Sequence, residues 1–213
     1  MTRLDAKLRA GLPEDPGSRR TPTFSWAEAV ALVERYNSEP FHLEHAHTVA
    51  GVMAWYADDL GYGEEREFWR LVGLLHDVDF EQFPEEHCVR GEALLLEAGV
   101  DPEIVRAAMS HGYGICSDIE PLHEMEKVLY ATDELTGLIS AVTVIRPSRS
   151  TLDLKLSSLK KKFKQNSFAA GCSRDTIRDG AERLGWELDL LLERTIAAMQ
   201  QLERDAAAAA GGD

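Results

Sequence analysis

The sequence lacks several features that define large classes of protein. No apolar run approaches the roughly 18 residues that a membrane-spanning helix needs, so no membrane protein is expected. There are only 3 cysteines in 213 residues, and none lie in a CxxC spacing. A disulfide framework is therefore not expected, and a reducing cytoplasm is the predicted compartment. The opening segment MTRLDAKLRAGLPEDPGSRR also lacks the apolar core of a signal peptide.

Positive charge is scarce, since 23 Lys and Arg residues face 37 Asp and Glu residues and the net charge is −14. Long nucleic acid is not expected as a partner, because phosphate backbones are bound by basic surfaces. A small phosphate ester needs only a local positive site. Residues 146–164 supply one, with seven basic residues and one acid. Arg146, Lys155 and Lys161 are the candidates to bind a substrate phosphate, although a solvated basic helix face explains most of these lysines.

The remaining composition is that of a globular protein, with 44% hydrophobic and 28% charged residues. Helical periodicity runs through most of the chain, and nothing indicates an extended sheet or an internal repeat. We therefore predict an all-α fold, a single helical bundle over residues 23–204. Residues 1–22 are predicted to be a flexible arm, and residues 205–213 a disordered tail.

Capping and stop signals predict where individual helices begin and end. Ser25 and Glu28 form a capping box, and Asp101-Pro102 is a helix start. Gly61 and Gly99 are natural stops. Further helices are expected over about 45–60, from about 65 to about 75, through 87 to 99, from 102 to about 110, over 122–144 and over 176–203.

Six side chains have the chemistry of metal ligands. The doublet His76-Asp77 ends the apolar run LVGLLHDVDF. Imidazole and carboxylate groups hold hard or borderline divalent metals. Adjacent helical residues diverge by about 100°, so the doublet is expected near a helix end, with Asp77 between two ions. The full candidate set is His45, His76, Asp77, His87, His111 and Asp133.

Each candidate has an alternative explanation when taken singly. His45 is preferred to His47 because it shares the helix face of Val49. His87 sits in the acidic run EEH and, from composition alone, is better explained as a solvated residue. His111 is explained equally well as a favourable charge at a helix C-terminus. A bare buried carboxylate is costly, which favours a partner or a metal for Asp133.

Two acids follow the doublet closely, Asp79 and Glu81. Either one orients a ligating histidine, donates a proton to a leaving group, or is simply an exposed loop acid. The loop GYGICSDIEP is expected to shape substrate entry, with Tyr113 and Ile115 as candidate contacts.

The segments LVGLLHDVDF, HAHTVAGVMAWYA, MSHGYG and VLYATDELTGLISA resemble the HD-domain superfamily of metal-dependent phosphohydrolases. More narrowly, they resemble bacterial HDIG-type hydrolases, over roughly residues 25–200. The resemblance implies a mononuclear ligand set that a second metal extends by two histidines. One departure is Val78-Asp79, where many members have Ile-Gly. The mononuclear set is His45, His76, Asp77 and Asp133, and the added ligands are His87 and His111.

The resemblance also implies an activity. One or two divalent ions (Mn, Fe, Co, Ni, Mg or Zn) would activate a hydroxide that attacks a small phosphate ester or nucleotide. Asp77 and Asp79 are the candidate catalytic residues. The alternatives are a mixed-valent di-iron oxygenase of the same superfamily and a non-catalytic nucleotide-binding module. A homo-oligomer is compatible with the sequence.

Overall fold

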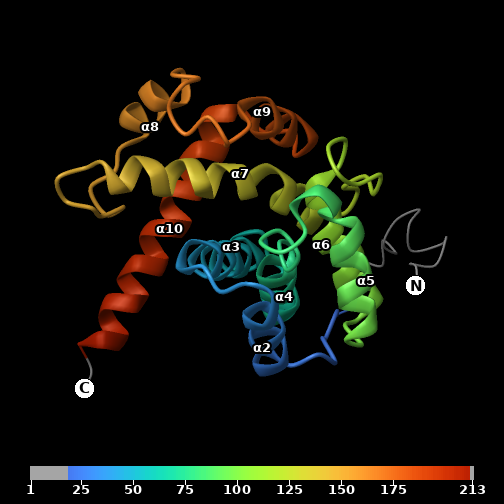
Figure 1. Ribbon diagram of the computed structural model, residues 1–213. Coiled ribbons are helices and arrows are strands. Elements are labelled where there is room, and N and C mark those ends of the chain that lie inside the picture. Colours follow the sequence, from blue (N-terminus) through green and yellow to red (C-terminus); the bar gives the residue numbers. More distant parts are fainter. Residues whose placement is uncertain (1–18, 212–213) are drawn as a thin grey trace. The chain divides into compact units, whose positions relative to one another are not determined.

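A computed structural model describes residues 19–211 of the chain. Nine α-helices and three short 3-10 helices make up the described part, and it contains no β-strand, only an isolated bridge between Tyr113 and Ser117. The predicted all-α fold is thus confirmed (Figure 1). None of the described helices is long and apolar enough to cross a membrane. Residues 1–18 of the predicted arm and 212–213 of the predicted tail lie outside the described residues.

The chain divides into two compact units, residues 1–130 and 131–213. The single domain expected over residues 23–204 stays a prediction. The first unit contains α2 (Trp26–Tyr36), α3 (Pro40–Asp59), α4 (Arg66–Leu75), α5 (Val89–Glu97) and α6 (Pro102–Met109). It also contains the 3-10 helices η1 (Gly63–Glu65), η2 (Pro84–Glu86) and η3 (Ser110–Gly112). The helix α7 (Glu124–Val144) begins in this unit and continues into the second.

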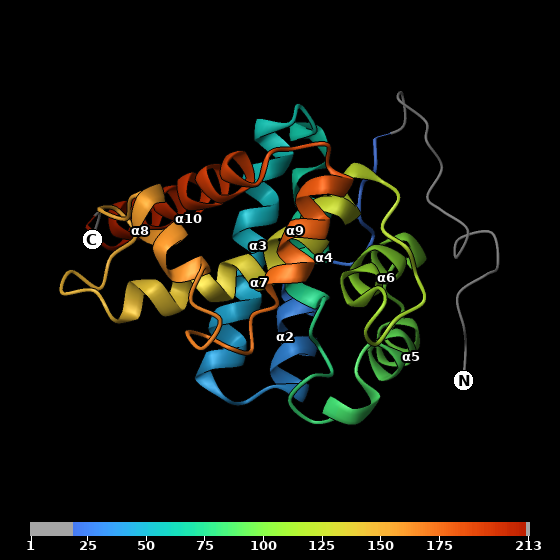
Figure 2. The ribbon, with the colours of Figure 1, turned by 90° about the horizontal axis from the view of Figure 1, so that it is seen from above.

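The core of the first unit forms around α4, which contacts α2, α3 and α6, while α5 packs against α6 (Figures 1 and 2). The sequence explains the close approach of α3 and α4. A Cβ atom at Gly73 would lie 2.8 Å from the Val49 carbonyl oxygen and 2.9 Å from Ala50 Cα. Real Cβ atoms do not approach backbone so closely, so only glycine permits this crossing. His45 precedes the crossing on α3, and His76 follows it as the C-cap of α4.

The predicted helix boundaries of the first unit are largely confirmed. The capping box of Ser25 and Glu28 is present at the start of α2, and Asp101 precedes α6 as its N-cap. Two starts differ from expectation. The helix α3 begins earlier, at Pro40, because proline suits the first helical position. The helix α5 begins only at Val89, so His87 lies before it at the end of η2.

The second unit contains the later part of α7 with α8 (Leu156–Phe163), α9 (Arg174–Arg183) and α10 (Leu188–Ala210). Both α8 and α9 pack against α10. A Cβ atom at Gly180 would lie 2.5 Å from Ala131 Cα, so glycine allows α9 to approach α7 closely. The loop before α8 is tied to α10, since Glu203 accepts hydrogen bonds from the Thr151 amide at 2.7 Å and the Thr151 hydroxyl at 2.6 Å.

Two predictions for the end of the chain are wrong. The expected long helix over 176–203 is broken into α9 and α10 by residues 184–187, where Gly185 adopts a φ of 68°. Left-handed backbone of this kind ends a helix, and glycine adopts it without strain. The other error concerns residues 205–210, which were assigned to a disordered tail but continue α10. Alanine has the highest helix propensity, which explains the extension.

Candidate metal centre

The doublet lies at the end of α4, as predicted. The apolar residues Leu74 and Leu75 are buried against the core, and they bring His76, fully buried, to the C-cap of the helix. Asp77 is the first residue after this C-cap, and 21% of its side chain is exposed. The α4 core thus fixes the backbone of both residues, while the carboxylate of Asp77 reaches the surface.

Four imidazole nitrogens surround the Asp77 carboxylate. Its Oδ2 lies 3.3 Å from His76 Nε2 and 3.7 Å from His45 Nε2. Its Oδ1 lies 3.2 Å from His111 Nε2 and 3.4 Å from His87 Nε2. Each oxygen therefore faces one pair of histidines. The carboxylate sits between the two pairs of imidazoles, and its placement between two ions stays a prediction.

The outer nitrogens of three rings are hydrogen-bonded away from the carboxylate. His76 Nδ1 donates to the Gly73 carbonyl at 2.8 Å, and His111 Nδ1 donates to the Ala108 carbonyl at 2.6 Å. A carbonyl only accepts, so Nδ1 must carry the proton in both rings. When these rings are neutral, Nε2 carries a lone pair on the side of Asp77, which is the tautomer a metal requires.

The third ring, His87, is oriented by Asp79. His87 Nδ1 donates to Asp79 Oδ1 at 2.9 Å, and the Gly91 amide donates to Asp79 Oδ2 at 2.6 Å. The Asp79 side chain is fully buried. Among the roles that the sequence left open for Asp79, this geometry supports the orientation of a histidine. It is not an exposed loop acid.

Electrostatic effects concentrate on this cluster. Burial opposes ionisation of Asp77, but the charges of His76 and His111 and their hydrogen bonds hold the pKa of Asp77 well below its usual range. Burial would lower the pKa of His87. The hydrogen bonds to Asp79 and Cys116 and the charges of Asp77 and Asp79 outweigh it and raise that pKa to about 10. The site thus stabilises the protonated form of His87 beside the ionised carboxylate of Asp77.

The donor set fits divalent metal ions. His87 Nε2 and His111 Nε2 lie only 3.1 Å apart, with the Nδ1 proton of each ring already committed. Two neutral rings in this tautomer would direct lone pairs at each other, so the close approach implies either a proton on one Nε2, which then donates to the other, or a metal ion between them. The group His45, His76 and Asp77 has ligand atoms within 4.8 Å of one another, as does the group His87, Cys88 and His111. Imidazole nitrogen with carboxylate oxygen suits Zn, Fe, Mn, Co or Ni.

Three further residues that the sequence analysis weighed are Asp133, His47 and Glu81. Asp133 belongs to the second unit, where it is half-buried on α7, and its role as a ligand stays a prediction. His47 is exposed and its ring lies 5.9 Å from that of Trp26. Glu81 accepts hydrogen bonds from the Ser38 and Glu39 amides at 2.9 and 3.0 Å, so it caps α3 and orients no histidine.

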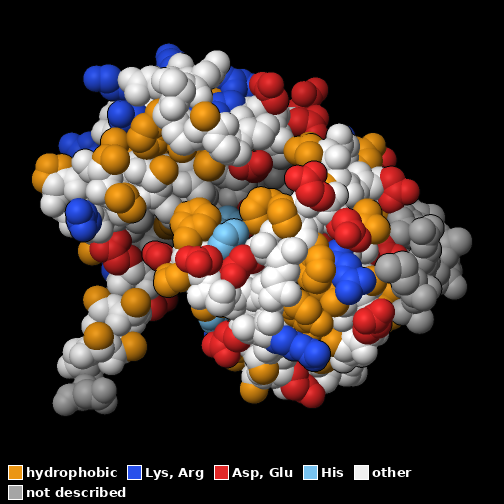
Figure 3. Space-filling view, viewed as in Figure 1, with side chains coloured by type: hydrophobic (Ala, Val, Ile, Leu, Met, Phe, Trp, Pro, Cys, Tyr) orange, Lys and Arg blue, Asp and Glu red, His pale blue; other side chains and the backbone are white. Residues whose placement is uncertain are grey.

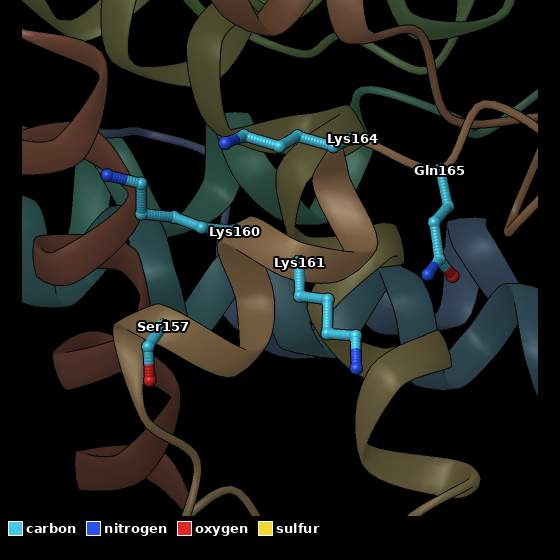
Figure 4. A pocket seen from close by; sticks show the side chains of 5 residues that line it. All are labelled: Ser157, Lys160, Lys161, Lys164 and Gln165. Atoms are coloured by element: carbon cyan, nitrogen blue, oxygen red, sulfur yellow. The ribbon is translucent and has the colours of Figure 1, made fainter.

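The basic candidates all belong to the second unit. Arg146 pairs with Asp153 at 2.7 Å, while Lys155 and Lys161 are exposed. Lysine and arginine side chains gather on the surface around α8 (Figure 3). An open surface pocket there is lined by Ser157, Lys160, Lys161, Lys164 and Gln165. Figure 4 shows the Lys160 and Lys164 side chains extending to one side and Lys161 to another, so three ammonium groups do not converge.

Two residues beside the centre had no role in the sequence analysis. Cys88 follows His87 directly, and Cys116 lies five residues after His111 in the loop after η3. Their sulfur atoms are 2.8 Å apart. The hydrogen bond from Cys88 outweighs burial and, with the bond and charge of His87, lowers the pKa of Cys116 to about 5. The adjacency of each cysteine to a predicted ligand was the signal available in the sequence.

Comparison with known proteins gives one match. The family model described as the HD domain matches residues 43–138, slightly under half of the chain. The matched residues include all six predicted ligands, two of which form the doublet. No curated protein and no solved structure matches the chain. HD domains bind divalent metals and are commonly metal-dependent hydrolases. The match supports the HD-domain superfamily for residues 43–138.

Proposed function

We propose that this chain is a metal-dependent phosphohydrolase of the HDIG type that holds two divalent ions and hydrolyses a small phosphate ester or nucleotide. The observation that carries the proposal is the Asp77 carboxylate with a pair of imidazole Nε2 atoms at each oxygen, all between 3.2 and 3.7 Å away. His45 and His76 would hold one ion, His87 and His111 the other, and Asp77 both. Asp133 is proposed as a further ligand from the family resemblance.

Two divalent ions supply Lewis acidity, which lowers the pKa of water and stabilises charge on phosphoryl oxygens. The side chains of the protein prepare the site for this chemistry. Gly73, Ala108 and Asp79 fix three ring orientations through the Nδ1 protons. Fixed ligands need no reorganisation during the reaction, which is the main source of catalysis in preorganised sites.

Two exposed aromatic side chains beside the histidines support a substrate with a flat apolar part. Phe41 is 69% exposed, and its ring stacks on that of His45 at 6.4 Å. Phe80 is 41% exposed, with its ring 5.0 Å from that of His87. Exposed aromatic rings offer stacking surface to a nucleobase, worth about 1–3 kcal/mol per base. A nucleotide with its phosphate at the metal centre is therefore the favoured substrate class.

The test is metal analysis of the purified chain followed by a panel of phosphomonoesters, phosphodiesters and nucleotides, with Mn²⁺, Co²⁺ or Ni²⁺ and without oxygen. We expect about two ions per chain and anaerobic release of phosphate or of a nucleoside monophosphate. Turnover that depends on O₂ and iron would contradict the proposal in favour of an oxygenase. A nucleotide that binds tightly and is recovered unchanged with every metal would contradict it in favour of a binding module.

Asp79→Asn is expected to weaken metal binding without abolishing it. The amide still fills the buried space but offers His87 Nδ1 a weaker acceptor, so the ring loses basicity and fixed orientation. Loss of such a partner typically costs 10–100-fold in metal affinity or activity. Titration with Zn²⁺ should show one site weakened and the other unchanged. Equal weakening of both sites would mean that Asp79 acts on the whole fold instead of on His87.

Lys161→Ala tests the basic segment. If Lys161 binds a substrate phosphate, its removal should raise KM roughly tenfold, because a charge-assisted hydrogen bond contributes about 1.5–3 kcal/mol. The control is Lys127→Ala, which removes a lysine outside the segment. A KM that is unchanged in Lys161→Ala and in Lys155→Ala would show that residues 146–164 are only a solvated surface.

A further inference from the structure

The two cysteines beside the metal centre form a close pair. Cys88 and Cys116 lie 28 positions apart in the sequence, yet their sulfur atoms are 2.8 Å apart and both thiols are free. Cys88 is 2% exposed, whereas Cys116 is only partly buried. The third cysteine, Cys172, belongs to the second unit and serves as an internal reference.

Local backbone structure holds both sulfur atoms in place. Cys88 has a φ of 64° and a ψ of −45°, the strained conformation at the centre of a γ-turn, which the hydrogen bond from the Val89 amide to the His87 carbonyl closes at 2.8 Å. Such strain persists only where the surrounding structure imposes it. On the other side, the Gly112 carbonyl accepts hydrogen bonds from the amides of Ile115, Cys116 and Ser117 at 2.9–3.0 Å. These bonds close a tight loop that presents Cys116 to Cys88.

Gly112 provides the space that the pair occupies. A Cβ atom at this position would clash with the sulfur atoms of both Cys88 and Cys116. The two sulfurs therefore pack over a bare backbone, at a position where any other residue would push them out. Three separate features, the strained backbone at Cys88, the closed loop and Gly112, bring the two sulfur atoms together.

We propose that Cys88 and Cys116 are a redox-active thiol pair that hydrogen peroxide oxidises to an intramolecular disulfide beside the metal centre. The more accessible Cys116 sulfur attacks the O–O bond, which breaks, and the thiol becomes a sulfenic acid with release of one water. The Cys88 sulfur then displaces the hydroxyl group, which leaves with the Cys88 proton as a second water. Two electrons pass from the two thiols to the peroxide, and one S–S bond forms. The proposal does not depend on the hydrolase activity.

The disulfide would link the segments that carry His87 and His111, since Cys88 adjoins the first and the loop of Cys116 follows the second. A cross-link over 28 positions reduces the freedom of the unfolded chain. The small movement needed from the present geometry keeps the native packing intact. The oxidised protein is therefore expected to have a higher Tm than the reduced protein.

The experiment uses the full chain as purified, with its metal content recorded, and treats it with hydrogen peroxide. We expect free thiols to fall from three to one, and a peptide map without reductant to join the peptides of Cys88 and Cys116. Dithiothreitol should restore three thiols. The Cys172→Ser variant should lose both of its remaining thiols and gain Tm on oxidation. Cys88→Ser should form no cross-link, and a sulfenic-acid probe should label its Cys116.

The proposal is overturned if all three thiols survive peroxide, or if the cross-link involves Cys172. It is equally overturned if Cys88 and Cys116 oxidise independently to sulfinic acids without a joined peptide. Because Cys88→Ser and Cys116→Ser keep the shape of the side chains, circular dichroism of both variants should match that of the parent protein. Cys88→Ser then isolates the formation of the sulfenic acid at Cys116, and Cys116→Ser prevents that step.

Discussion

An Asp77→Asn variant is expected to lose bound metal and turnover together. The carboxylate faces four imidazoles, at distances from 3.2 to 3.7 Å. An amide has nearly the same shape, but it carries no charge and has only one oxygen. Charge stabilisation by the metals contributes several kcal/mol, so kcat/KM should fall by about 1,000-fold or more. Metal content measured on the same preparation should fall in parallel.

The matched control is Asp58→Asn, the same substitution at an exposed position on α3. Asp58 pairs with Arg66 at 2.8 Å on the surface, an interaction worth about 0–1 kcal/mol. This control should keep full metal content and activity. If Asp77→Asn retained both metals and full turnover, Asp77 would not be the shared ligand. A variant that kept its metals but lost turnover would assign Asp77 to the reaction instead of to metal binding.

Much of the candidate site could be read from the sequence because its key residues adjoin strong local signals. The apolar run before His76 predicts a buried helix, and the divergence of adjacent helical residues favours a helix end for the doublet. The preference for His45 over His47 followed from helix periodicity, and His45 does face Asp77 while His47 is exposed. These inferences need only the geometry of one helix.

The roles that the sequence left open depend on contacts across the fold. The role of Asp79 is set by His87 and the Gly91 amide, and periodicity does not reveal such pairing. Glu81 lies two residues further on, yet it caps α3, which precedes it by some 40 positions. Neighbouring acids thus take different roles according to the partners that the fold presents. The pairing of Cys88 with Cys116 is of the same kind.

Capping signals predict two helix starts correctly, whereas the start of α3 at Pro40 differs from the expected one. The capping box of Ser25 and the Asp101-Pro102 start are both present. The sequence predicts one long helix over 176–203 in spite of Gly185, because a glycine inside a helix costs about 1 kcal/mol relative to alanine but is tolerated. The φ of 68° at Gly185 ends α9 instead. Sequence alone does not decide between these two roles of glycine, since the choice depends on the packing of α9 and α10.

A second large effect is expected on stability, from Arg106→Met. Arg106 and Glu126 form an ion pair in which both side chains are fully buried. The Arg106 guanidinium also donates to the Glu120 carbonyl at 3.0 Å. Glu126 additionally accepts from the Leu122 and His123 amides at 2.9 and 3.0 Å. Removing the arginine leaves a buried carboxylate without its countercharge, which costs about 3–5 kcal/mol in the free energy of unfolding.

Chemical denaturation measures this loss, and Arg66→Met is the matched control. Arg66 pairs with Asp58 on the surface with 44% of its side chain exposed, so its loss should cost at most about 1 kcal/mol. A double variant, Arg106→Met with Glu126→Leu, removes both buried charges and should recover part of the stability, because the main penalty is the uncompensated charge. Equal losses in the single and double variants would indicate that packing, and not charge, explains the effect of Arg106. Arg106 lies on α6, and His111 follows that helix in η3. We therefore expect Arg106→Met to lower metal affinity only under conditions in which α6 is unfolded.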